Sequence, residues 1–216
     1  MIKIETFVNS PIDENTYIVN DASHDAAIID CGALLPINRQ AIADYISREG
    51  LHVTAHVLTH GHFDHMFGAQ WVADTYGCAP LLHPADAALY EGAVEMVCAF
   101  FHRRFDFDVP PVSGFLKDND TLSFGSHTMR VIPCAGHTPG GVCLYIEDEG
   151  VLFTGDSIFQ GSIGRSDLDG GNHDDLISNL NKHVLTLPEE VIIYPGHGPQ
   201  TTVRNEKLFN PYVRRY

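Results

Sequence analysis

Four potential metal ligands stand within six residues, at His60, His62, Asp64 and His65, directly after a hydrophobic run. Positions 60 and 62 cannot share one face of a helix, because helical neighbours are three or four residues apart. A tight loop, in contrast, can turn both imidazoles toward one point. A chance match to this pattern in a chain of this composition has a probability of roughly 0.4%. The loop therefore predicts a metal site rather than a histidine-rich surface segment.

Three further candidate ligands, His137, Asp156 and His197, each follow an expected strand and lie beside glycines. Taken singly, each has an ordinary structural interpretation: a turn histidine, a helix N-cap and a surface-loop residue. Taken with the first loop, they complete a set of imidazoles and carboxylates, which are ligands that suit Zn²⁺ or iron. No cysteine belongs to this set, which disfavours a thiolate site.

The order and setting of these seven positions resemble the metallo-β-lactamase superfamily, and the resemblance covers essentially the whole chain. It implies an α/β fold, the four-layer αβ/βα sandwich, in which two mixed β-sheets are flanked by helices and metals lie in a groove at the strand ends. It also implies how the ligands divide: His60, His62 and His137 to one metal, Asp64, His65 and His197 to the second, and Asp156 as the bridge between them. Zinc is the expected metal, with iron or a mixed iron–zinc pair as alternatives.

The implied centre predicts a hydrolytic mechanism. Two metals about 3.5–4 Å apart can share one hydroxide, because each lowers the pKa of bound water toward ~7. A nucleophile then exists at neutral pH, with Asp64 and Asp156 as the catalytic carboxylates of the centre. Asp30, before Cys31 and Gly32, is similar to the superfamily's aspartate near the site. It would accept a hydrogen bond from the loop or from a ligand imidazole, or else cap its strand.

Within the superfamily, the segments 156–159, 161–167, 195–199 and 210–212 resemble the short glyoxalase-II-like hydrolases of bacteria. This resemblance implies hydrolysis of a small acyl thioester, such as S-D-lactoylglutathione, by attack of a metal-bridging hydroxide. The longer glyoxalase II enzymes carry an extra C-terminal helical region with glutathione contacts, which a chain ending at Tyr216 largely lacks. We therefore expect a high Michaelis constant for glutathione thioesters.

Other activities on this scaffold stay open. A persulfide dioxygenase uses a single iron held by two histidines and one aspartate, but such relatives usually carry Pro-Ala-His-Asp where this chain has Pro195-Gly196-His197-Gly198. A β-lactamase is disfavoured because the chain shows no export signal and has Asp156 where one zinc subclass has a cysteine ligand. The acidic composition disfavours a nuclease. A non-enzymatic metal-binding or interaction protein is the last alternative.

Three residues are expected to meet the substrate. Phe100 and Phe101 lie with Met96 along one side of a helix expected at 86–104, which borders the groove in relatives. The alternative for these side chains is ordinary core packing. Arg165 would bind a substrate carboxylate, or would pair with Asp167 and fix its own loop.

The composition predicts one globular domain that spans residues 1–216, since 44% of the residues are hydrophobic and 19% are charged. The formal net charge of -15 would repel nucleic acid and anionic membranes, so a small-molecule thioester is the expected partner. Five cysteines without a CxxC pair, no signal peptide and no long apolar run predict reduced thiols in a cytoplasmic protein that does not enter a membrane. The sequence leaves the oligomeric state open.

The remaining segments predict the elements that position these motifs. Strands are expected at 2–8, 16–20 and 26–30 as an N-terminal meander, and at 53–58, 80–83 and 191–194. Pro36 begins a helical pattern that Gly50 ends, and further helices are expected at 67–76, at 86–104, near 174–183 and from 203. Two hairpins pair 121–124 with 127–133 and 142–147 with 151–154. His56 and His83 match no motif and are interpreted as packing or surface histidines.

Overall fold

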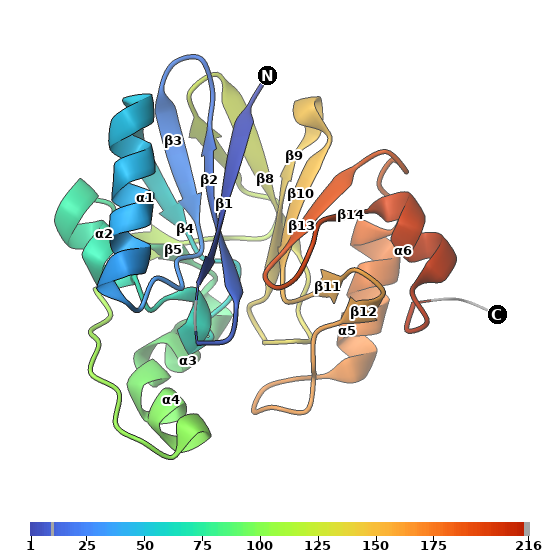
Figure 1. Ribbon diagram of the computed structural model, residues 1–216. Helices are drawn as coiled ribbons and strands as arrows, with labels where there is room; N and C mark the ends of the chain where they lie inside the picture. The colour runs from blue at the N-terminus through green and yellow to red at the C-terminus, as the bar shows by residue number, and fades with distance from the viewer. Residues whose placement is uncertain (10, 214–216) are drawn as a thin grey trace.

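Two six-stranded mixed β-sheets pack face to face in the computed structural model, which describes residues 1–9 and 11–213 (Figure 1). In the first sheet, β1 to β3 are antiparallel neighbours, whereas β3 to β6 pair in parallel. Its strands, in spatial order, are β1 (Lys3–Asn9), β2 (Glu14–Asn20), β3 (Asp25–Ile29), β4 (His52–Val57), β5 (Leu81–Leu82) and β6 (Gly114–Phe115).

The second sheet is antiparallel except where β10 and β13 pair in parallel. Its strands, in spatial order, are β14 (Thr201–Thr202), β13 (Ile192–Pro195), β10 (Val151–Gly155), β9 (Val142–Ile146), β8 (His127–Pro133) and β7 (Thr121–Phe124). A separate small ribbon consists of β11 (Ile158–Phe159) and β12 (Ser162–Ile163).

Helices cover the outer faces of both sheets, with α1 and α2 against the first sheet and α5 and α6 against the second (Figure 1). The helices are α1 (Pro36–Glu49), α2 (Ala69–Tyr76), α3 (Ala87–Glu91), α4 (Ala93–Phe101), α5 (His173–Asn179) and α6 (Val203–Phe209). Short turns of other helix types are η1 (Phe63–His65), η2 (Pro84–Asp86), η3 (Glu147–Glu149) and η4 (Leu180–Val184). Together these layers confirm the predicted α/β sandwich of two mixed sheets with flanking helices.

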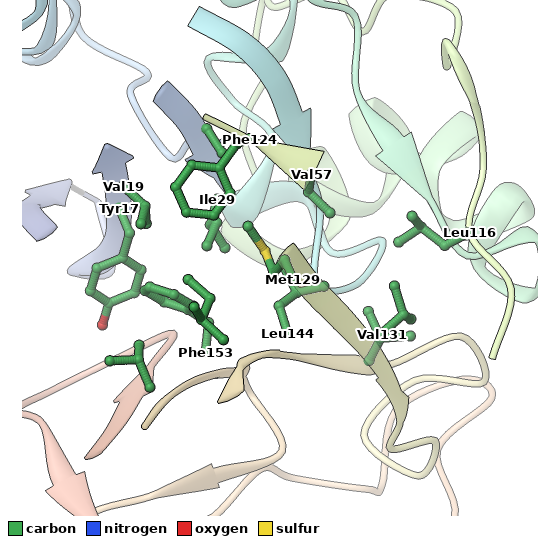
Figure 2. Close-up of a cluster of buried hydrophobic side chains, with 14 residues drawn as sticks. Tyr17, Val19, Ile29, Val57, Leu116, Phe124, Met129, Val131, Leu144 and Phe153 are labelled. Atoms are coloured by element: carbon green, nitrogen blue, oxygen red, sulfur yellow. The ribbon is translucent and has the colours of Figure 1, made fainter. Parts of the chain in front are cut away.

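The inner faces of the two sheets share one apolar core. Tyr17 and Ile29 of the first sheet pack with Met129, Leu144 and Phe153 of the second (Figure 2). Each is at most 3% exposed, and burial of apolar surface contributes about 25 cal/mol per Å² to stability. Because strand side chains alternate between faces, the neighbours of these residues point outward and pack under the helices. This core fixes the spacing of the sheets, so the loops at its edge face one another.

The prediction of a single helix at residues 86–104 is wrong. The structure has two shorter helices, α3 and α4, separated by Gly92, and α4 ends at Phe101. Glycine is about 1 kcal/mol less favourable than alanine inside a helix, which explains the interruption. His102 then takes φ 52, a left-handed conformation that ends the helix.

Other differences from prediction are smaller. The helix expected from residue 67 begins at Ala69, and the helix expected near 174–183 continues from α5 into the π-helical turn η4. The strands β6, β11, β12 and β14 were not predicted, because two residues are too few to show an alternating pattern. Within the described ranges, no helix has the length and apolar character needed to cross a membrane. All five cysteines in these ranges are free, as predicted.

His56 is a buried histidine whose two ring nitrogens have no hydrogen-bond partner among the described residues. It is 1% exposed and stands in β4 opposite Ile28 of β3. Burial lowers the pKa of His56 from 6.5 to about 3. The folded state therefore keeps this imidazole neutral, and its role is packing.

Replacing His56 by leucine is expected to reduce the acid sensitivity of the protein. The unfolded chain takes up a proton below about pH 6.5 that folded His56 does not accept until about pH 3. Proton uptake by the unfolded chain therefore has no effect on stability above pH 6.5 and lowers the stability of the folded state as the pH drops toward 3, by about 2 kcal/mol between pH 7 and pH 5. Urea unfolding at these two pH values measures the change. The exposed His52→Leu on the same strand is the control, and an equally steep acid loss in His56→Leu would contradict this account.

Candidate metal centre

The seven predicted ligands come together at one edge of the sandwich. The loop after β4 carries four of them, and the segments after β8, β10 and β13 carry His137, Asp156 and His197. These three strands run in the same direction, because β8 and β10 are both antiparallel to β9 and β13 is parallel to β10. Their carboxyl ends therefore meet at the edge that the β4 loop reaches from the other sheet.

His60, His62 and His137 form a first donor group. One ring nitrogen of each lies within 4.8 Å of the other two. His62 Nδ1 is 2.9 Å from His137 Nε2. All three side chains are buried. Three imidazoles that converge on one buried point are a typical ligand set for zinc or non-haem iron.

Asp64, His65 and His197 form a second donor group, again with one donor atom of each within 4.8 Å of the others. Asp64 Oδ2 lies 3.2 Å from His197 Nε2 and 3.5 Å from His65 Nε2. His65 is fully buried, whereas 24% of the His197 side chain is exposed. This group combines one carboxylate with two imidazoles and lies nearer to solvent than the first.

Asp156 lies between the two groups. Its Oδ2 is 3.6 Å from Nε2 of both His137 and His197, and its Oδ1 is 3.3 Å from His65 Nε2. Gly196 leaves the necessary space, because a Cβ at that position would lie 2.3 Å from Asp156 Oδ1. A carboxylate in this place is positioned to bridge two metals.

The imidazoles are oriented by hydrogen bonds on their far side. Four of the five use Nδ1 for this purpose, which keeps Nε2 directed at the centre, and the fifth, His62, directs Nδ1 there. The pairs are His60 with Thr59 Oγ1 (3.1 Å), His65 with Asp30 Oδ2 (2.9 Å), His137 with the Arg165 carbonyl (2.6 Å) and His197 with the Asp13 carbonyl (3.1 Å). Such outer hydrogen bonds fix both the tautomer and the orientation of a metal-binding histidine.

The charges of the centre also favour a cation. Burial and the neighbouring imidazoles lower the pKa of His60 well below its usual value, and they lower that of His62 to about 4. Both are therefore neutral at pH 7, the form that binds a metal. Burial opposes charge on His65, but the surrounding carboxylates, chiefly Asp64 and Asp30, outweigh it and raise the pKa of His65. The carboxylates thus favour positive charge at this point, which a divalent metal supplies.

Three buried polar atoms of the centre find no hydrogen-bond partner in the described part of the chain: His60 Nε2, His65 Nε2 and Asp156 Oδ1. A buried polar atom without a partner costs about 1–3 kcal/mol. All three belong to the donor groups described above, so metal ions would satisfy them. The donor set and these atoms together fit divalent metals.

Asp30 attaches the ligand loop to the first sheet. Its carboxylate accepts hydrogen bonds from the Thr59 backbone N–H (2.7 Å), the Thr59 hydroxyl (2.8 Å) and His65 Nδ1 (2.9 Å). Its backbone has φ 55, a left-handed conformation that aspartate tolerates better than most residues with a Cβ. Of the two roles expected for Asp30, a hydrogen-bond acceptor and a strand-end cap, the structure shows the first, toward the loop and the imidazole of the candidate ligand His65.

Asp86 is a supporting residue that the sequence did not reveal. Its fully buried carboxylate accepts hydrogen bonds from the Gly61 N–H (2.8 Å), the Thr138 hydroxyl (2.7 Å) and the Gly140 N–H (2.6 Å). It therefore joins the ligand loop after β4 to the loop that carries His137. The glycines allow this close approach, since a Cβ at Gly140 would lie 2.8 Å from the Asp86 carboxyl group.

Glu14 is a second supporting residue that the sequence did not reveal. It is 1% exposed and accepts hydrogen bonds from the Gly32 N–H (3.0 Å) and the Thr16 hydroxyl (2.9 Å). Burial raises the pKa of Glu14 to about 8. Its carboxyl group lies within 4.8 Å of donor atoms of Asp30 and His65, so β2 places it next to the centre.

A cavity of about 520 Å³ opens beside the centre, a size typical of small-molecule sites. Phe100 lines it and is half exposed, whereas Phe101 is not among the described lining residues and packs against Phe63. Arg165 also lines the cavity, but its Nε and Nη2 each donate to the Asp167 carboxylate at 2.8 Å. The structure thus shows the loop-fixing pair expected for Arg165, and substrate contact by Phe100 stays a prediction.

Comparison with known proteins identifies relatives of this chain. Residues 10–197 match the family model described as the metallo-beta-lactamase superfamily. An uncharacterized protein of Mycobacterium leprae is 37% identical, with 92% of this chain and 93% of the relative covered. A probable metallo-hydrolase of Bacillus subtilis is 32% identical, with 95% of each chain covered. A hydroxyacylglutathione hydrolase of Haemophilus influenzae is 30% identical, with 98% of each covered.

Two solved structures are also similar along nearly their whole length. The BLEG-1 B3 metallo-beta-lactamase has a TM-score of 0.89 and 34% identity, with 99% of each chain covered. The protein TTHA1623, solved in a di-iron-bound form, has a TM-score of 0.83 and 32% identity, with 96% of this chain and 99% of that chain covered. The second structure shows that a protein with this fold holds two metals.

We expect two metal ions per chain, because two donor groups and a carboxylate between them are present. Asp156→Ala should release metal from both sites, whereas His197→Ala should mainly empty one. Elemental analysis after dialysis measures both effects, with the exposed Asp74→Ala on α2 as the control. A wild-type stoichiometry that saturates at one metal, with His65 and His197 unbound in a crystal structure, would count against the two-metal assignment.

Asp86→Asn is expected to weaken metal binding by about 10- to 100-fold, the usual cost of losing a residue that holds metal ligands in place. The amide has the size of the carboxylate, but one of its two ends is a donor that would face the N–H and hydroxyl donors around it. Competition with a chelating dye measures metal affinity, and urea unfolding measures stability. The matched control is Asp74→Asn. Metal affinity equal to that of the wild type would show that Asp86 does not position the ligand loops.

Proposed function

Because the chain belongs to the metallo-beta-lactamase superfamily, we propose that it is a metal-dependent hydrolase that cleaves a small acyl thioester such as S-D-lactoylglutathione. The observation that carries this proposal is the pair of donor groups joined by Asp156 at the base of a cavity with an apolar wall. The relative in Haemophilus influenzae named as a hydroxyacylglutathione hydrolase supports the choice of substrate class.

Two metals would be held by the seven candidate ligands, with Asp156 shared between them. When bound, such ions would activate water at neutral pH and polarise the carbonyl that is attacked. The protein contributes the orientation of the imidazoles through their Nδ1 hydrogen bonds, and Asp64 and Asp156 supply the negative charge of the centre. The apolar cavity wall would hold the substrate and exclude bulk water.

A thioester fits the cavity because its leaving group needs little acid assistance. Apart from the metal-centre residues, Arg165, Asp167 and Asp169 are the titratable side chains among the described lining residues. The hydrogen bonds from Arg165 lower the pKa of Asp167 to about 2, so Asp167 cannot donate a proton at neutral pH. A thiol, with a pKa of about 8.5, leaves readily as the thiolate, whereas an amine must be protonated to leave.

Two other activities are alternatives to thioester hydrolysis. β-Lactam hydrolysis is supported by the similarity to a B3 metallo-beta-lactamase structure. A mononuclear iron persulfide dioxygenase would need only two histidines and one aspartate, so it would leave a complete donor group without a use. The excess of donors favours the hydrolase over this second alternative.

A side-by-side assay of the metal-loaded enzyme tests the proposal. We expect loss of S-D-lactoylglutathione absorbance at neutral pH, no oxygen uptake with glutathione persulfide and little turnover of a cephalosporin. Asp156→Ala should lower thioester turnover by at least about 100-fold, since it removes the shared carboxylate. Oxygen consumption with persulfide and no thioester cleavage would establish the dioxygenase instead. Turnover of the cephalosporin alone would establish a β-lactamase.

A further inference from the structure

The cavity beside the metal centre has an apolar wall. Its members come from η1, α3, α4 and the segments at residues 12 and 159–168, and they are Ile12, Phe63, Leu89, Met96, Phe100, Phe159 and Leu168. The exposed charged residues that line the same cavity, Arg165, Asp167 and Asp169, form what we call its rim. A substrate whose carbonyl lies at the metal centre must place the rest of its atoms against the apolar wall and this rim. The groups on the rim therefore act on the part of the substrate that does not react.

The rim of the cavity is acidic. Arg165 is the one lysine or arginine among the described residues that line it, against the two carboxylates of Asp167 and Asp169. Arg165 Nε and Nη2 both donate to the Asp167 carboxylate, so the positive charge of Arg165 is balanced by the negative charge of Asp167. Asp169 forms no ion pair in the described part of the chain and stays exposed. Among the described lining residues, the rim therefore has one negative charge in excess and no cation outside an ion pair.

This charge distribution opposes an anionic thiol carrier. A carboxylate on the thiol part would meet Asp167 and Asp169, and the net charge of -15 would add a long-range repulsion that salt screens. A cationic group would be attracted by the same carboxylates. It would also meet Phe100, which is half exposed in the same cavity, and aromatic faces attract quaternary ammonium groups.

We propose that this cavity selects acyl thioesters by the charge of their thiol part, with cationic carriers preferred to neutral ones and neutral carriers preferred to anionic ones. The inference rests on the proposed thioester hydrolysis and assigns the selectivity to Asp167 and Asp169. It would also give a structural reason for the high Michaelis constant expected with glutathione thioesters, because the glutathione moiety carries two carboxylates and one ammonium group.

Three acetyl thioesters that differ in the charge of the thiol part test this selectivity. The probes are acetylthiocholine (cationic), S-acetyl-N-acetylcysteamine (neutral) and S-acetyl-3-mercaptopropionate (anionic). Each kcat/KM for the metal-loaded enzyme is divided by the rate of alkaline hydrolysis of the same ester, which removes differences in intrinsic reactivity. We expect the cationic ester to exceed the anionic one by at least about 10-fold at low salt. The ratio should shrink between about 20 mM and about 500 mM salt.

Variants of the rim residues test whether the charge selectivity depends on Asp167 and Asp169. Asp169→Asn should raise the normalised kcat/KM of the anionic ester, and lower that of the cationic ester, by about 3- to 5-fold each. Asp167→Asn should change the two kcat/KM values in the same directions. It should also release Arg165 from its ion pair, so that the guanidinium can bind an anionic substrate group. Asp44→Asn, at an exposed position on α1, changes the net charge by the same amount and should leave the order unchanged. The metal content of each variant is measured, since the Arg165 carbonyl also holds His137.

Binding separates this inference from the proposed reaction. The thioether analogues of the cationic and anionic esters cannot be hydrolysed, and calorimetry should show tighter binding of the cationic one. Equal normalised kcat/KM values for the three esters would overturn the selectivity. It would also be overturned if Asp169→Asn and Asp44→Asn changed the relative kcat/KM values of the esters equally. If none of the esters were cleaved, the thioesterase proposal would fail, and equal affinity of the two thioethers would then overturn the selectivity as well.

Discussion

One electrostatic constraint organises this molecule: five imidazoles and two carboxylates are held close together in a largely buried space. These groups satisfy one another only in part, because His60 Nε2, His65 Nε2 and Asp156 Oδ1 have no hydrogen-bond partner in the described ranges. Their convergence must therefore be enforced by the surrounding structure until a cation satisfies them. Asp30, Asp86 and the carbonyls of Asp13 and Arg165 do so with hydrogen bonds that leave the metal-facing atoms unused.

The centre also depends on the packing of the two sheets. Four candidate ligands follow β4 of the first sheet, and three follow strands of the second. The shared core fixes the spacing between these halves, while Asp86 joins their loops directly through Gly61 and Gly140. A change in sheet spacing would therefore separate the ligands of one metal, because His60 and His62 belong to one half and His137 to the other.

The sequence allowed accurate prediction where the chemistry is local. The two-residue spacing of His60 and His62 excludes one face of an α-helix, and the long alternating strands gave the correct hairpins and the correct fold class. Asp86 was missed because its hydrogen bonds reach 25 residues back to Gly61 and 54 residues forward to Gly140, a separation that leaves no sequence pattern. The break at Gly92 was missed because the apolar side chains around it continue the helical periodicity.

The hydrogen bond from His137 to the Arg165 carbonyl has a thermodynamic consequence. It joins a candidate metal ligand to the segment that forms the cavity rim, so the order of that segment and the orientation of the imidazole are linked. A molecule that stabilises the rim would then raise the affinity of the centre for a metal bound by His137, and linkage requires the metal to raise the affinity for that molecule by the same factor. The change in metal affinity caused by such a molecule and the change in its own affinity caused by the metal would thus both measure one coupling free energy.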